Sequence, residues 1–161
     1  MPYPLEVRAQ RVVPAPQGAV FALLADLENH WRIAGRFIEV LTLDRDAGGR
    51  AHGGRVRMHG PLGTGRTAAT RVLAVDAPRL MTGSADVGRG TSAIVRWKLR
   101  SHEAGTTVRL EATVERAGLL DRALLAIGGR RWLERRFADV LDRLADAVAA
   151  RSVPAAVSAP A

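Results

Sequence analysis

The side chains that most often perform acid–base or metal chemistry are thinly spread in this chain of 161 residues. The helical zinc motif HExxH is absent, and the four histidines fall in predicted loops or at an outward strand position: His30, His52, His59 and His102. The chain has no cysteine, which excludes disulfides and thiolate metal ligands and fits a reducing cytoplasm. No GxSxG nucleophile motif occurs. We therefore expect no metal and no bound cofactor, and the sequence assigns no catalytic residue.

One segment is similar to a phosphate-binding loop. Residues 60–67 read GPLGTGRT, with Arg66 in the place of the usual lysine, and Asp76 ends the apolar run 72–75 as an acidic strand would. Only residues 68–71 separate the two, whereas a crossover between parallel strands needs about a dozen residues or more. The spacing therefore excludes nucleotide hydrolysis.

Arginine is the residue best suited to anchor a ligand here. The strand predicted around residues 66–75 turns one arginine inward in either phase of its alternation, Arg66 in one phase and Arg71 in the other. A guanidinium inside an apolar pocket would anchor a carboxylate, a phenolate or an enolate. The alternative is a bulge or rim position that keeps the arginine in water.

A basic cluster near the C-terminus surrounds Trp132 and Leu133. It consists of Arg130, Arg131, Arg135 and Arg136. One interpretation is a solvated helix face. The other is a docking surface for an acidic partner, such as a carrier protein that delivers a tethered acyl chain.

The net charge of +8 is a weak indicator of partners. Lys98 is the only lysine among 24 basic residues, and such arginine bias is typical of GC-rich coding sequence. A basic surface attracts phosphate, acidic proteins and anionic membranes alike. Aromatic residues make up only 4% of the chain, and no helix-turn-helix is recognisable, so we expect no specific nucleic-acid partner.

The element that must position these residues is a long amphipathic helix predicted over Leu119 to Val148. Its apolar stripe recurs at steps of four, four, three and four residues, through Leu133, Phe137, Leu141, Leu144 and Val148. Such a stripe must be covered by another element. The half before residue 133 is irregular and contains Gly128-Gly129, which makes it a candidate cavity wall or moving gate.

The rest of the chain alternates as strands and turns. Strands are predicted at residues 5–13, 37–43, 55–59, 67–75, 80–87, 93–100 and 108–115, with two short helices between the first two strands, ending near Ala25 and Gly35. Short turns between consecutive strands indicate an antiparallel meander. We expect an α+β fold in which residues 1–151 form a single domain, followed by a flexible tail at 152–161.

Several segments at the joints between these elements match a known pattern in the correct order. They are residues 20–31 (VFALLADLENHW), 71–80 (RVLAVDAPRL), 97–99 (WKL), 105–110 (GTTVRL) and 140–145 (VLDRLA). This order resembles the START-like, helix-grip (SRPBCC) superfamily, particularly its polyketide cyclase/dehydrase and lipid-transport branch. The resemblance covers about residues 3–150. It implies a seven-stranded curved sheet that wraps around the last helix and encloses an apolar cavity.

Candidate cavity residues follow from the predicted inward positions and from this resemblance. They are Met58, Val95, Trp97, Leu110, Ala112, Leu124, Ile127 and Phe137, together with Gly128, where a ligand could approach the backbone. Trp31 and Arg36 fall where related proteins have residues of the cavity mouth. The alternative is that most of these residues are ordinary core, and that Trp31 packs the second short helix onto the sheet.

The function that we expect is a cytoplasmic carrier of a hydrophobic or aromatic small molecule, such as a lipid, a polyketide or a quinone-like compound. The N-terminus lacks the pattern of a signal peptide, and no apolar run is long enough to span a membrane. The alternative is a polyketide cyclase or dehydrase in which Arg66 or Arg71 stabilises an enolate. A basic RNA- or ribosome-associated module is the least favoured interpretation.

Overall fold

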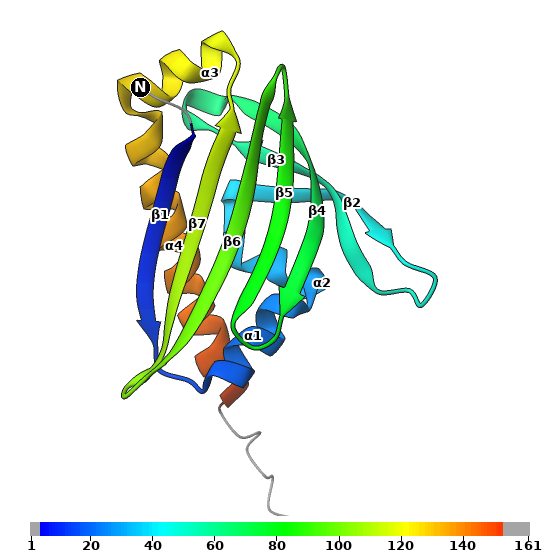
Figure 1. The fold of residues 1–161 in the computed structure, drawn as a ribbon, viewed down its shortest axis with the longest axis vertical. Helices are drawn as coiled ribbons and strands as arrows, with labels where there is room; N and C mark the ends of the chain where they lie inside the picture. Colours follow the sequence, from blue (N-terminus) through cyan, green and yellow to red (C-terminus); the bar gives the residue numbers. More distant parts are fainter. Residues whose placement is uncertain (1–3, 153–161) are drawn as a thin grey trace, which may run out of the picture.

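A computed structural model describes residues 4–152 of the chain. The strands are β1 (Leu5–Val13), β2 (Ile38–Arg45), β3 (Ala51–His59), β4 (Gly65–Asp76), β5 (Leu80–Gly88), β6 (Thr91–His102) and β7 (Gly105–Arg116). They form one sheet in the order β1-β7-β6-β5-β4-β3-β2, and every neighbouring pair is antiparallel (Figure 1). The predicted seven-stranded antiparallel sheet is confirmed.

Two short helices follow β1, as predicted. They are α1 (Gln17–Ala25) and α2 (Leu27–His30), and the 3-10 turn η1 (Trp31–Phe37) continues α2. Buried side chains hold α1 to the sheet because four of its nine residues point inward: Val20, Phe21, Leu23 and Leu24. Another 3-10 turn, η2 (Pro61–Gly63), joins β3 to β4.

The predicted long C-terminal helix is confirmed, and it is interrupted near Gly128-Gly129. The segment consists of α3 (Leu119–Leu124), a π-helical turn η3 (Leu125–Gly129) and α4 (Arg130–Ser152). The break lies at Gly128, whose φ of 134° is open to glycine and strained for other residues. The predicted tail, apart from Ser152 at the end of α4, lies outside the described residues.

The strand boundaries differ most in the β2–β3 hairpin. The predicted turn at residues 44–54 is shorter in the structure, because β3 begins at Ala51 and Gly54 pairs with Leu43. Glycine and aspartate mark a turn in the sequence, but the hydrogen-bonded ladder continues through two of those glycines.

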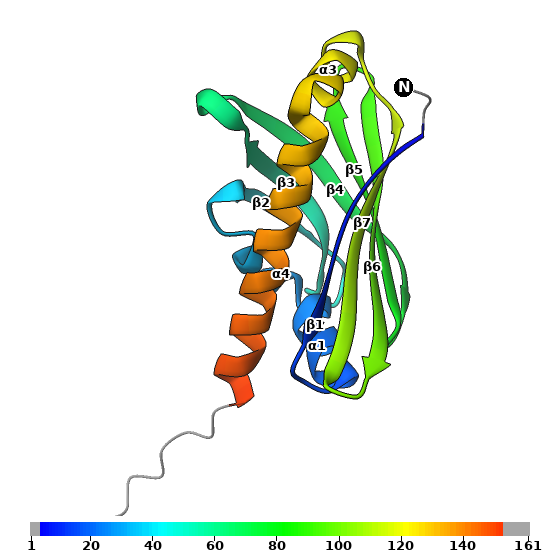
Figure 2. The same cartoon turned by 90° about the vertical axis from the view of Figure 1, so that its left-hand side faces the viewer.

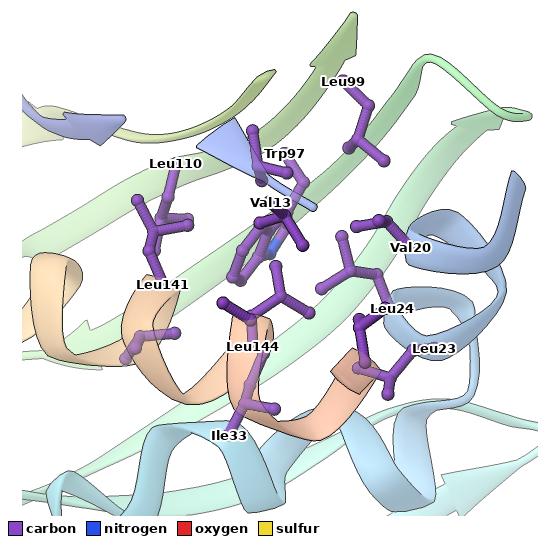
Figure 3. Packing of buried hydrophobic residues seen from close by; sticks show 14 of the residues in the cluster. Val13, Val20, Leu23, Leu24, Ile33, Trp97, Leu99, Leu110, Leu141 and Leu144 are labelled. Atoms are coloured by element: carbon purple, nitrogen blue, oxygen red, sulfur yellow. The ribbon is translucent and has the colours of Figure 1, made fainter. Parts of the chain in front are cut away.

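The main core lies between the sheet, α1 and the C-terminal half of α4 (Figure 3). Leu141, Leu144 and Val148 of α4 are 0–3% exposed and pack with Trp97 and Leu110 of the sheet. At the edge of the sheet, Arg11 of β1 forms an ion pair with Asp142 of α4. This half of α4 is the anchor that the periodic stripe predicted.

Only one face of the sheet is covered by helices (Figure 2). Alternation along β4 shows which one, since Ala68 and Thr70 turn toward the helices and Ala69 and Arg71 turn away. We call the covered side the inner face. Arg66 lies on the inner face, and Arg71 is exposed on the outer face, which resolves the two phases left open by the sequence.

Candidate functional site

The inner face changes character along the strands. Near α1 it carries large side chains, and Met81, Trp97 and Leu110 are at most 5% exposed. Toward α3 it carries small ones, which we call the small-residue zone: Thr70, Gly83, Ala85, Ala93 and Ala112. Small side chains cannot fill the separation of about 10 Å between a sheet and the layer packed on it.

Partial exposure indicates that this zone is not filled. Thr70, Gly83, Ala85 and Ala93 keep intermediate exposure although they lie on the covered face in central strands. Val95 next to them is also half-buried, and so is Phe137, where α4 packs against the core. The arrangement suits an apolar ligand held between the sheet and the first turns of α4.

Three aromatic rings lie together at one side of the core. His30 packs edge-on against Trp31 and Trp97, with ring centroids 5.0 and 5.3 Å away. The His30 Nδ1 atom lies 2.9 Å from the carbonyl oxygen of Leu24, which requires the proton on Nδ1. Burial lowers the pKa of His30, although the bond to Leu24 opposes the shift, so the ring is neutral at pH 7.

The indole of Trp31 is the unsatisfied member of this cluster. Its Nε1–H group is buried and has no hydrogen-bond partner among the described residues. A buried donor of this kind costs free energy unless a ligand or water accepts its hydrogen bond. Trp31 is therefore both a packing residue, through His30, and a candidate polar contact for a ligand.

A pocket of about 230 Å³ lies between η1, the end of β3 and α4. Three arginines line it, one from η1 and two from α4, and we call it the arginine pocket. Its lining residues are Ala34, Arg36, Phe37, His59, Gly60, Trp132, Arg136, Asp139 and Arg143. Phe37 and Trp132 pack edge to face at 5.5 Å and form its apolar wall.

Positive charge exceeds negative charge in the arginine pocket. Arg136 pairs with Asp139 at 3.3 Å, its guanidinium lies 5.8 Å from the Trp132 ring centre, and its buried Nε has no partner among the described residues. Neither Arg36 nor Arg143 forms an ion pair within residues 4–152. The pocket can therefore accept a carboxylate, sulfonate or phosphate group.

Gly35 helps to build this pocket. Its φ is 59°, and the guanidinium of Arg143 occupies the space where a Cβ atom would lie. Any side chain at position 35 would displace Arg143. The sequence indicated only that Gly35 ends a helix, because nothing local connects it with a residue more than 100 positions later.

Arg66 is inward but already paired. Its guanidinium forms an ion pair with Asp121 of α3 and also donates to the carbonyl oxygens of Val87 and Gly88, at 3.3 and 3.4 Å. The hydroxyl of Thr91 donates to the same carboxylate. Burial alone would raise the pKa of Asp121, but the hydrogen bonds from Arg66 and Thr91 outweigh it and lower that pKa.

The other predicted cavity residues fall into three groups. Trp97, Leu110 and Ala112 are buried, and the first two belong to the main core. Met58, Val95 and Phe137 are half-buried on or facing the inner face. The prediction that Leu124 and Ile127 point inward was wrong, since they are 47% and 81% exposed. Gly128, beside Ile127, is exposed as well.

Several contributors to the site were missed in the sequence. His30 was predicted to be a loop residue, yet it is buried between two tryptophans. Arg143 lies outside the apolar stripe of the last helix, where the sequence pattern indicates only a solvated charge. No group of three or more potential metal ligands occurs among residues 4–152. Within the same range, no helix is long and apolar enough to cross a membrane.

The curved antiparallel sheet, covered on one face by a long C-terminal helix, defines the helix-grip fold. Residues 4–149 match the family model described as polyketide cyclase / dehydrase and lipid transport. The chain belongs to this family, and the resemblance seen in the sequence is confirmed.

Solved structures share this fold at low sequence identity. TTHA0849 from Thermus thermophilus superposes with a TM-score of 0.74 at 23% identity, over 92% of this chain and 99% of that one. Ara h 8.0201 superposes with a TM-score of 0.64 at 12% identity, over 91% of this chain and 98% of that one. DynU16, a putative protein in the dynemicin biosynthetic locus, gives 0.58 at 19% identity, over 89% of this chain and 47% of its own. None of the curated proteins matches the chain in sequence.

Proposed function

We propose that this protein is a carrier that binds a hydrophobic or aromatic small molecule between the inner face and the N-terminal half of α4. The observation that carries the proposal is the partial exposure of four residues of the small-residue zone on the covered face, namely Thr70, Gly83, Ala85 and Ala93. An apolar ligand placed there would gain about 25 cal/mol for each Å² removed from water. Lipids, polyketides and quinone-like compounds all offer such a surface.

The arginine pocket adds a preference for an anionic group on that ligand. Phe37 forms its apolar wall, and the next residue, Ile38, packs against the main core, so the pocket lies at the rim of the interior. A ligand with an apolar body and a carboxylate, phenolate or sulfonate would satisfy both regions. Arg36 and Arg143 are the cations that we assign to the anionic end.

A carrier role agrees better with the contacts of Arg66 than a cyclase role does. Stabilising an enolate requires a cation that is free to meet the developing charge. Arg66 is already neutralised by Asp121, and Arg71 lies on the outer face. The alternative of a cyclase or dehydrase would therefore need another group in that role.

Binding of 1-anilinonaphthalene-8-sulfonate tests this proposal, because that probe joins an aromatic body to a sulfonate. Ala85→Leu fills the small-residue zone and should weaken binding by about tenfold or more. Ala69→Leu is the matched control, since it makes the same change on the exposed outer face of the neighbouring strand. Equal affinity of the two variants would contradict the proposed site.

The anionic end is tested separately with Arg36→Gln combined with Arg143→Gln. We expect about a tenfold loss of affinity for the sulfonate probe and a weaker dependence on salt. Arg32→Gln is the control, because Arg32 belongs to the same turn η1 but does not line the pocket. An unchanged affinity in the double variant would remove the arginine pocket from the proposal.

A further inference from the structure

Exposed aliphatic side chains are concentrated at one end of the molecule. Leu119, Leu120, Leu124 and Ile127 lie within nine residues of α3 and η3, and each is 47–85% exposed. Leu62 in the turn η2 is fully exposed. This turn lies at the same end of the molecule as α3 (Figures 1 and 2). We call these five residues the apolar end.

The opposite side of α3 and η3 is fixed to the sheet. Asp121 receives hydrogen bonds from Arg66 and Thr91, and Leu125 packs in a small cluster with Leu5 and Val114. The backbone N–H of Gly118 donates to the Thr91 hydroxyl at 3.0 Å. Rotating the segment to bury its leucines would break this network, so the leucines remain exposed.

The charge around these leucines is positive. Residues 116–131 contain five charged side chains, of which four are arginine, namely Arg116, Arg122, Arg130 and Arg131. The fifth, Asp121, is neutralised by Arg66, and Arg130 pairs with Glu134 one turn further along α4, so the segment keeps a net positive charge. Aliphatic side chains flanked by arginine are the composition of segments that lie in the interface of an anionic bilayer.

We propose that the apolar end is a docking surface for an anionic lipid membrane. Its aliphatic side chains come from a helical ridge and a separate turn, and a fluid bilayer accommodates such projecting groups without a matching pocket. A second copy of this chain would bring the same arginines into opposition, which electrostatic repulsion disfavours. The proposal does not depend on which ligand the interior binds.

Co-sedimentation with vesicles tests the proposal. The full chain should bind vesicles of phosphatidylcholine with about one third phosphatidylglycerol, bind pure phosphatidylcholine much less, and lose affinity as salt rises. Leu120→Gln combined with Ile127→Gln should reduce partitioning to the anionic vesicles by about tenfold or more. Arg130→Gln combined with Arg131→Gln should weaken it about fivefold or more and flatten its salt dependence.

The matched control is Leu73→Gln combined with Val75→Gln. These residues of β4 are aliphatic and 52% and 54% exposed, but they lie away from the apolar end. The control should bind vesicles like the natural chain. Equal binding by the Leu120/Ile127 variant would overturn the proposal, and so would a dimer in sedimentation velocity that this variant abolishes. Every variant should keep the melting temperature of the natural chain and its affinity for the naphthalene probe. These two measurements exclude a loss of folding as the cause of weaker vesicle binding.

Discussion

Both parts of the C-terminal helical segment contain several leucines and alanines, but their leucines have opposite environments. In α4, Leu141, Leu144 and Val148 are at most 3% exposed and complete the main core. In α3 and η3, the exposed fractions of Leu120 and Ile127 are 59% and 81%. Apolar content is therefore a poor guide to burial, because the contacts on the other face of each helix decide which way it turns.

The contacts that orient the two halves also differ in kind. The C-terminal half is held by apolar packing, with one ion pair at the sheet edge between Arg11 and Asp142. The N-terminal half is held by a polar network around Asp121 and by a cluster of few apolar residues. We expect the C-terminal half to dominate the global stability of the fold. The N-terminal half should respond more to pH, because a titratable carboxylate holds it in place.

Truncation of a core leucine should give the largest difference between the halves. Leu144→Ala is expected to lower the free energy of unfolding by about 2–5 kcal/mol, because it leaves a cavity in a fully buried site. Ile127→Ala should change it by less than about 0.5 kcal/mol. Chemical denaturation of both variants measures the contrast, and similar losses would mean that the exposed ridge is buried in solution.

Removal of the carboxylate at Asp121 should give an intermediate effect. Asp121→Asn removes the charge-assisted bonds from Arg66 and Thr91, and we expect a loss of about 2 kcal/mol at pH 7. The pKa of Asp121 is lower in the folded than in the unfolded state, so its stabilisation is present above the unfolded pKa and is lost as pH falls through the folded pKa. The difference in unfolding free energy between the natural chain and Asp121→Asn should therefore narrow below about pH 4.

His30, at the edge of the main core, should give the smallest effect. Its pKa is lowered on folding, so below about pH 6.5 the unfolded chain binds a proton that folded His30 does not take up. The natural chain should therefore lose stability as the pH falls below about 6.5. His30→Asn keeps a donor for the Leu24 carbonyl but has no proton to gain, so its stability should not fall in this pH range for that reason. If the variant and the natural chain showed the same dependence of stability on pH, His30 would not be its cause.

Period-two alternation was sufficient to predict the sheet. The β6–β7 hairpin shows why, since apolar and charged residues alternate from Val95 to Leu99, and their partners from Ala112 to Val108 alternate in the same way. The stripe of α4 was equally readable, because Leu141 and Leu144 fall on one helical face.

The parts of the site that depend on long-range contacts could not be predicted. Gly35 and Arg143 are more than 100 residues apart, and the arginine pocket exists only because the fold brings them together. The direction of Ile127 was misread because the periodic rule takes apolar residues as inward, while Gly128 interrupts the helix next to it. The phase of β4 was ambiguous until its pairing with β3 placed Arg66 opposite Met58.

The place of β1 in the sheet has a consequence for synthesis on the ribosome. Within residues 4–152, the first strand pairs only with the last one, with Leu5 opposite Val114, and α4 then packs along it. Translation proceeds at about 5–20 residues per second, so roughly 5–20 s pass between the synthesis of β1 and the synthesis of its partner β7. During that interval the apolar inner face lacks its covering helix. Folding cannot be completed until β7 and α4 have been translated, and chaperones that shield apolar strands should influence the yield of this protein more than its final stability.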